Sequence, residues 1–253
     1  MRKLLIFITI VSTFLFGCLN TEEELTIDAN GSGVYKNSVD LSGLLDMMEM
    51  MSSMDTSADA GLKKLSEKNI DSAVEFKSFV DTVASLTNEQ KKLFEKATVR
   101  IQMNQQEKAF KLTMSYPFSA LDDLQKLIEL QQSDKLPNPL QQSMGNEVPP
   151  GSGRLPSIDK IMKMRFTNGL IERKIDQEKL ADLKNSEQFK EAGQMDDMMQ
   201  SITFSSTFNL PKAAKNISGE KLKLSDDKKT ATINYTLLDV IKSPSSLEYK
   251  IEY

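Results

Sequence analysis

The sequence predicts an α+β fold in which antiparallel β-hairpins alternate with helices, and in which the helices cover one face of the sheet. Three observations support this fold class. Apolar and polar residues alternate in paired segments such as 99–103 and 110–116, as expected for strands with one buried face. Helix-capping signals, such as the one at Thr87, stand between these pairs. Short turns such as Asn168-Gly169 favour antiparallel neighbours.

The first predicted elements are a hairpin and a methionine-rich helix. Residues 25–27 and 34–41 are β-prone and flank a stretch that is dense in turn formers. Ser42 is placed to cap an amphipathic helix over 43–54. The methionines of this helix give it a soft apolar face, which either packs into the core or binds a ligand. The candidate binding residues on that face are Met47, Met50 and Met51.

The segment from 87 to 132 contains a helix, a hairpin and a second helix. Thr87 and Gln90 have the spacing of a capping box, which begins a helix. Acidic residues shortly after Ser119 favour another helix start, because they oppose the positive end of the helix dipole. In chain order we expect a helix over 87–97, a hairpin over 99–116 that Pro117 ends, and a helix from Ser119 to about Gln132.

A proline- and glycine-rich stretch over 133–157 separates two parts of the chain. It holds five of the eight prolines, a composition typical of a linker or an extended surface loop. We therefore divide the chain into a first α+β half over 25–132 and a second over 158–253. One continuous domain formed by both halves is equally compatible with the pattern.

The second half repeats the pattern of strands and helices. Asn168-Gly169 between two β-prone segments is a strong hairpin signal and is suited to a type I′ turn. A polar helix is predicted over 177–200, with a break near Gly193. The remaining segments alternate like strands, and we expect strands over 163–166, 170–175, 202–208, 222–224, 231–237 and 247–253.

The amino terminus has the organisation of an export signal. Arg2 and Lys3 precede the uncharged apolar run 4–16, which is shorter than the roughly 20 residues that a membrane-spanning helix needs. We therefore expect residues 1–17 to be a signal peptide.

The end of this segment, Leu15-Phe16-Gly17-Cys18, resembles the lipobox of bacterial lipoproteins. The resemblance implies that the processing machinery attaches lipid to Cys18 and that the signal peptidase cleaves before it, with Leu15, Phe16 and Gly17 as recognition residues. It also implies that acyl chains, including palmitate, hold the mature protein on a membrane of the cell envelope.

Residues 18–24 read as the acylated cysteine followed by an acidic tether. Glu22, Glu23 and Glu24 either belong to a solvated tether or resemble the surface-export signals of Bacteroidota lipoproteins. Several short segments also look like uncharacterised lipoproteins of Bacteroidota, namely 217–219, 222–224, 226–228, 232–235 and 243–248. This resemblance implies an outer-membrane location; a periplasmic and a surface orientation both stay open.

Composition excludes several classes of function. The chain has no histidine and one cysteine, so histidine-dependent nucleophile systems, haem ligation by histidine and zinc sites of imidazole or thiolate are excluded. We expect no metal and no cofactor. Removal of residues 1–17 takes away two positive charges and changes the net charge from −4 to −6. An acidic chain of this kind is a poor partner for nucleic acid.

The remaining candidates for catalysis are carboxylates and a Ser-x-x-Lys spacing. The spacing from Ser225 to Lys228 is common enough to arise by chance. The adjacent acidic pairs are Asp122-Asp123, Asp196-Asp197 and Asp226-Asp227, and adjacent side chains usually point apart. The first pair is better explained as helix-dipole partners and the last as turn formers. We therefore expect no catalytic residues and a lipid-anchored, non-enzymatic domain that binds an envelope protein or lipid. The alternative is a lipid-anchored hydrolase that uses carboxylates.

Overall fold

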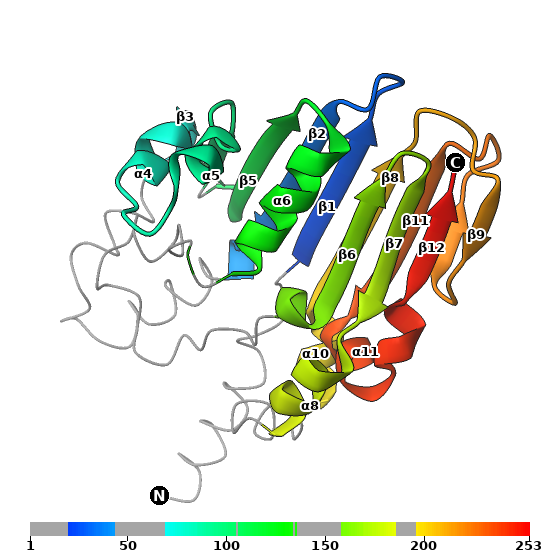
Figure 1. Ribbon diagram of the computed structural model, residues 1–253. Coiled ribbons are helices and arrows are strands. Elements are labelled where there is room, and N and C mark those ends of the chain that lie inside the picture. Colours follow the sequence, from blue (N-terminus) through cyan, green and yellow to red (C-terminus); the bar gives the residue numbers. More distant parts are fainter. Residues whose placement is uncertain (1–19, 44–68, 105, 134, 136–157, 186–195) are drawn as a thin grey trace, which may run out of the picture.

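The computed structural model describes residues 20–43, 69–104, 106–133, 135, 158–185 and 196–253. It contains two β-sheets that pack face to face (Figure 1), with the rings of Phe208 and Tyr249, one from each sheet, 5.4 Å apart. The larger sheet has eight strands in the order β10-β11-β8-β1-β2-β5-β4-β3, and the smaller has four in the order β6-β7-β12-β9.

The strands of the larger sheet are β1 (Asn20–Ile27), β2 (Gly33–Asp40), β3 (Ile70–Glu75), β4 (Thr98–Asn104), β5 (Ala109–Phe118), β8 (Thr203–Asn209), β10 (Leu222–Leu224) and β11 (Thr230–Thr236). Those of the smaller sheet are β6 (Met162–Thr167), β7 (Leu170–Ile175), β9 (Asn216–Ser218) and β12 (Tyr249–Glu252). The helices are α4 (Lys77–Asp81), α5 (Asn88–Lys92), α6 (Leu121–Gln131), α8 (Gln177–Asn185), α10 (Asp196–Ser201) and α11 (Leu237–Lys242), with short 3₁₀ turns η2 (Ile158–Ile161) and η3 (Pro244–Leu247).

The predicted α+β class with mostly antiparallel strands is confirmed. The exception is the pair β1 and β8, which is parallel and aligns Asn20 with Thr203. Strands from both sides of residues 133–157 therefore share one sheet. The predicted linker and the predicted helix over 43–54 lie almost entirely outside the described residues.

Helix α6 extends the second layer by lying beside the edge strand β6 (Figure 1). The side-chain amide of Gln125 donates to the Met164 carbonyl at 3.1 Å and accepts from the Phe166 N–H at 3.0 Å. Two turns later, Gln132 donates to the Met162 carbonyl at 2.9 Å. These glutamines satisfy backbone groups that an edge strand would otherwise leave unpaired.

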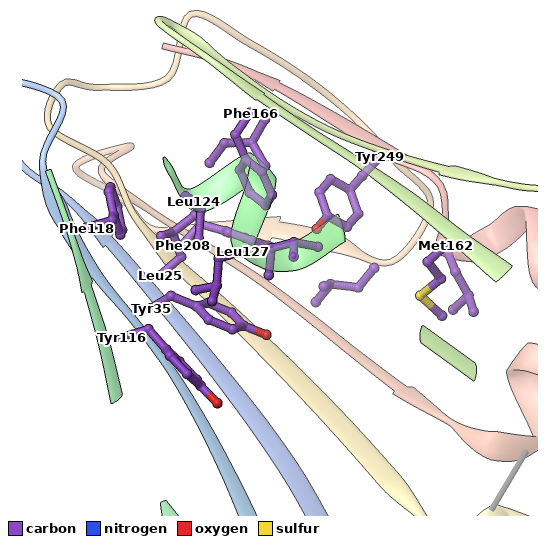
Figure 2. Close-up of a cluster of buried hydrophobic side chains, with 14 of the residues drawn as sticks. Leu25, Tyr35, Tyr116, Phe118, Leu124, Leu127, Met162, Phe166, Phe208 and Tyr249 are labelled. Carbon is purple, nitrogen blue, oxygen red and sulfur yellow. The ribbon is translucent and has the colours of Figure 1, made fainter. Parts of the chain in front are cut away.

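The core lies between the larger sheet and the layer formed by α6 and the smaller sheet. Spacings of three and four residues place Leu124, Leu127 and Ile128 on one buried face of α6. Figure 2 shows this core, in which side chains of α6 meet side chains of both sheets; the labelled members include Leu25, Tyr35, Phe208, Phe166 and Tyr249.

Two predicted boundaries in the first half are wrong. The helix that begins after Thr87 has the predicted capping box, but it ends at Lys92, because the following turns close with tighter three-residue hydrogen bonds as far as Ala97. Strand β5 does not end at Pro117, which lies opposite Val34 of β2. A proline is tolerated there because pairing with β4 stops at Ser115, so no neighbour requires the missing N–H.

Two predictions in the second half also need correction. The hairpin at Asn168-Gly169 is confirmed, but its turn is not type I′, since Gly169 has a φ of 84° and Asn168 is not among the described residues with positive φ. Leu237 does not continue β11 but begins α11. Thr236 and Asp239 form a capping box there that converts the strand into a helix.

Replacing Gln125 by alanine should lower the free energy of unfolding by about 1–3 kcal/mol, because two partly buried backbone groups of β6 lose their partner. Urea unfolding of the purified chain measures this. Lys126→Ala on the same helix is the control, since it removes an exposed ion pair to Asp122, and exposed ion pairs contribute little to stability. Equal effects of the two changes would contradict a structural role for Gln125.

Candidate functional site

A row of polar residues crosses the buried face of the larger sheet. Glu23 of β1 lies opposite Asn37 of β2 on one side and opposite Ser206 of β8 on the other. All three share the face that carries Leu25, because side chains two residues apart in a strand point the same way. The row centred on Leu25 is apolar, so the polar row interrupts an otherwise apolar surface.

Glu23 is held by two hydroxyl groups. The Tyr35 hydroxyl donates to its Oε1 at 3.0 Å, and the Ser206 hydroxyl donates to its Oε2 at 2.8 Å. Asn37 differs, because its buried Oδ1 has no hydrogen-bond partner among the described residues.

Arg173 of β7 approaches this row from the smaller sheet. Only 2% of its surface is exposed, and its guanidinium lies 4.9 Å from the ring centre of Tyr235 and 4.6 Å from that of Tyr249. Its Nε donates to the Leu247 carbonyl at 2.8 Å, and its Nη1 donates to the Tyr235 hydroxyl at 3.5 Å. The guanidinium is therefore held between rings from both sheets.

The Nη2 group of Arg173 is buried and has no hydrogen-bond partner among the described residues. Burial disfavours the charged guanidinium, but the two tyrosines and Glu23 outweigh it, so the pKa of Arg173 lies above its ordinary value. Burial also raises the pKa of Tyr249 far above its usual range. A full positive charge is thus kept inside the protein with two unused N–H donors.

These groups line one cavity of about 70 Å³ between the two layers. One water needs about 10–15 Å³ of such space, so the cavity has room for a few waters or a small polar molecule. Its polar wall contains Glu23, Asn37 and Arg173, and Gln131 and Gln132 of α6 lie beside them. The remaining wall is mainly apolar and is formed by residues that include Leu25, Ile128, Met162, Met164, Phe166 and Phe208.

Asp176, which directly follows β7, is a buried ion that has hydrogen-bond partners, and it can be compared with Arg173. Its side chain is 9% exposed and accepts from Lys163 Nζ at 2.8 Å. It also accepts from the backbone N–H groups of Glu178 and Lys179 at 3.2 and 3.3 Å. Asp176 therefore has structural partners, whereas Arg173, which lines a cavity, keeps unused donors.

The three glutamates predicted to be a tether or export signal lie within β1. The strand begins at Asn20, five residues earlier than predicted, and its alternation splits the glutamates between two faces. Glu22 forms an ion pair with Lys111 at 2.7 Å, and Glu24 forms one with Lys36 at 3.2 Å. Glu23 points to the cavity, so the three do not form one acidic surface.

The other predicted sites are only partly described. Asp122 lies in the first turn of α6 and forms an ion pair with Lys126, and Asp227 accepts from Ser225 Oγ at 2.6 Å within a turn. Asp196 and Asp197 begin α10, but their side chains lie outside the described part. Also outside it are the lipobox residues Leu15, Phe16, Gly17 and Cys18 and the candidate apolar face Met47, Met50 and Met51.

Sequence analysis missed the cavity residues, although the sequence carries a signal for them. Arg173 occupies an inward position of β7 between Ile171 and Ile175, where the alternation requires an apolar residue. Glu23 similarly precedes Leu25 at the same spacing in β1. A charged residue at a strand position that faces the core costs free energy, which makes it a candidate functional residue.

Within the described residues, no helix is long and apolar enough to cross a membrane. No group of three or more potential metal ligands occurs in the same part of the chain.

No protein-family model matches the sequence, and no curated protein matches it. Among solved structures, the chain is similar to the folded domain of the Mycobacterium tuberculosis protein LppM, determined by NMR. The match has a TM-score of 0.38 and 7% sequence identity, and it covers 93% of this chain and 90% of that chain. A likeness at this level supports no conclusion about the function of this chain.

The stability of the fold should depend on pH through Asp176. The Lys163 hydrogen bond is the main cause that lowers the pKa of this carboxyl below its ordinary 3.8, and N–H groups at the start of α8 add to it. The ionised form therefore stabilises the fold fully above the unfolded pKa, and this contribution is lost as the pH falls through the folded pKa.

Urea unfolding of wild type and Asp176→Asn should show a stability difference that is constant from about pH 7 to about pH 5 and then narrows as the pH falls. Lys163→Met should weaken the same pH dependence, because it removes the principal partner. A difference that stays constant over the whole range would rule out this role.

Proposed function

We propose that this chain is a non-enzymatic, lipid-anchored domain of the cell envelope that holds a small polar ligand in the cavity between its two sheets. The observation that carries the binding role is the buried Arg173, which lines the cavity and whose Nη2 group has no partner among the described residues. A buried charged donor without a partner costs free energy, and a ligand that accepts from it removes that cost.

The envelope location in this proposal rests on the predicted signal peptide 1–17 and on Cys18. Strand β1 begins at Asn20, and two residues of extended chain reach at most about 7 Å. A lipid on Cys18 would thus hold the sheet directly at the membrane surface. We favour the outer membrane, as the resemblance to Bacteroidota lipoproteins implies, with the lipoprotein-processing machinery as an earlier partner.

The binding role is favoured over hydrolysis by the composition of the cavity wall. A hydrolase of the predicted kind needs two carboxylates on either side of the bond that it breaks. Glu23 is the one carboxylate among the described residues that line the cavity. Its two oxygens already accept hydrogen bonds from hydroxyl groups, which position it as a fixed negative charge.

A Cys18→Ala variant tests the anchor. Incorporation of a fatty-acid analogue should be abolished and the protein should leave the membrane fraction, because each buried CH₂ of an acyl chain contributes about 0.8 kcal/mol to membrane binding. Labelling and fractionation of cells that express wild type or variant measure this. Unchanged labelling of the variant would exclude Cys18 as the site of lipid attachment.

An Asn37→Leu variant tests the binding role without breaking any described side-chain hydrogen bond of Asn37. The ligand-free variant should be as stable as wild type or more stable by about 1 kcal/mol, because an unsatisfied buried polar group is replaced by an apolar one of similar size. It should nevertheless fail to retain the ligand, since leucine occupies the polar wall.

The measurement compares small molecules released on denaturation of wild type and Asn37→Leu, each purified from native membranes. Asn216→Leu, at an exposed position of β9, is the control and should retain the same molecule as wild type. Loss of stability in Asn37→Leu, or the absence of any retained molecule in wild type, would contradict the proposal.

A further inference from the structure

Two charges of opposite sign, the buried Arg173 and the partly buried Glu23, line the same small cavity. Arg173 approaches from β7 and Glu23 from β1, and Glu23 is close enough to raise the pKa of the guanidinium. Among the interactions of the described residues, no ion pair joins Arg173 and Glu23. The charged atoms of the two side chains therefore lie more than 4.0 Å apart. The space between them has a positive and a negative end.

The unused hydrogen-bonding groups are arranged in the same way, with donors at the positive end and acceptors at the negative end. At the positive end, Nη2 of Arg173 offers N–H donors without acceptors. At the negative end, each oxygen of Glu23 accepts one described hydrogen bond and can accept another, while Oδ1 of Asn37 accepts none. A complementary ligand therefore carries an acceptor at one end and several donors at the other.

We propose that the cavity binds a small zwitterion, namely an α-amino acid whose carboxylate contacts Arg173 and whose ammonium group contacts Glu23 and Asn37. This inference rests on the proposed function of the cavity as a ligand site. A carboxylate and a guanidinium form a strong charge-assisted pair, and an ammonium group supplies three donors for the two acceptors opposite.

The size of the cavity supports the same ligand class. About 70 Å³ holds a molecule of a few heavy atoms, whereas pockets for larger ligands measure about 300–1,000 Å³. An acyl chain does not fit this space. The apolar wall near Met162, Met164 and Phe166 provides room for a small apolar side chain such as the methyl group of alanine.

Ligands with one charge match only half of the site. Acetate pairs with Arg173 but brings a second negative charge toward Glu23, and methylamine pairs with Glu23 but is repelled by Arg173. Since these interactions take place in a buried site, they are screened less than they would be at the surface. The zwitterion compensates both protein charges at once.

The test is calorimetric titration of the full acylated chain, purified in detergent, with glycine, alanine, acetate and methylamine at neutral pH and low salt. Glycine and alanine should bind at least about tenfold more tightly than either half-ligand, a ratio that corresponds to a single additional charge pair. This series needs no variant and is therefore independent of any folding defect.

A Glu23→Gln variant tests the negative end. Glutamine has nearly the same shape but carries no charge; its carbonyl oxygen accepts from one of the two hydroxyl groups, and its NH2 group donates to the other, which can turn to accept. Glycine should bind at least about tenfold more weakly to this variant, and acetate should bind more tightly than it does to wild type. Glu22→Gln is the matched control on the opposite face of β1 and should change neither affinity.

The outcomes separate the two proposals. If acetate binds wild type as tightly as glycine does, and Asn37→Leu abolishes both, the zwitterion inference is overturned while the cavity stands as a ligand site. If none of the four probes binds wild type and it also retains no small molecule from native membranes, both proposals fail and the cavity holds water alone. Tighter binding of glycine that Glu23→Gln removes supports both.

Discussion

The buried guanidinium of Arg173 is a charged contact that joins the two sheets. Moving an unpaired ion out of water costs several kcal/mol, and here no carboxylate of the described residues forms a direct ion pair with it. Two aromatic faces, from Tyr235 in one sheet and Tyr249 in the other, supply part of the compensation. A charge-assisted hydrogen bond to the Leu247 carbonyl supplies more. The charge is thus stable only while both sheets are in contact.

The cavity draws on strands that are distant in the sequence. The Ser206 hydroxyl reaches Glu23 across 183 positions, through the parallel pairing of β1 with β8. Such long-range pairing requires a large loop to close before its contacts contribute, which slows folding. The glutamines of α6 then close the edge of β6 beside the cavity. The polar wall of the cavity therefore forms only when the whole domain is folded.

Local pattern was enough to predict most of the strands but not their assembly into two sheets. Alternation and turn residues identified β4, β5, β8 and β11 to within a few residues, because each buries one face. They failed at β1, where three consecutive glutamates look solvated although Glu23 points inward. They failed again at Leu237. The alternation of apolar residues continues there, but the capping box at Thr236 begins a helix instead. Which strands pair is decided by contacts far apart in sequence, and no local pattern contains that information.

The same reasoning explains why the cavity was not predicted. Arg173 and Glu23 each break the apolar alternation of their own strand, and each exception looks like a solvated residue when its strand is read alone. Only the sheet-to-sheet packing brings the two exceptions to one cavity. A fold that needed only stability would gain by replacing both with apolar residues, since well-packed apolar groups often stabilise as much as a buried ion pair. The cavity keeps the two charges separated and leaves donors and acceptors unused, which is the arrangement expected where stability is given up for recognition.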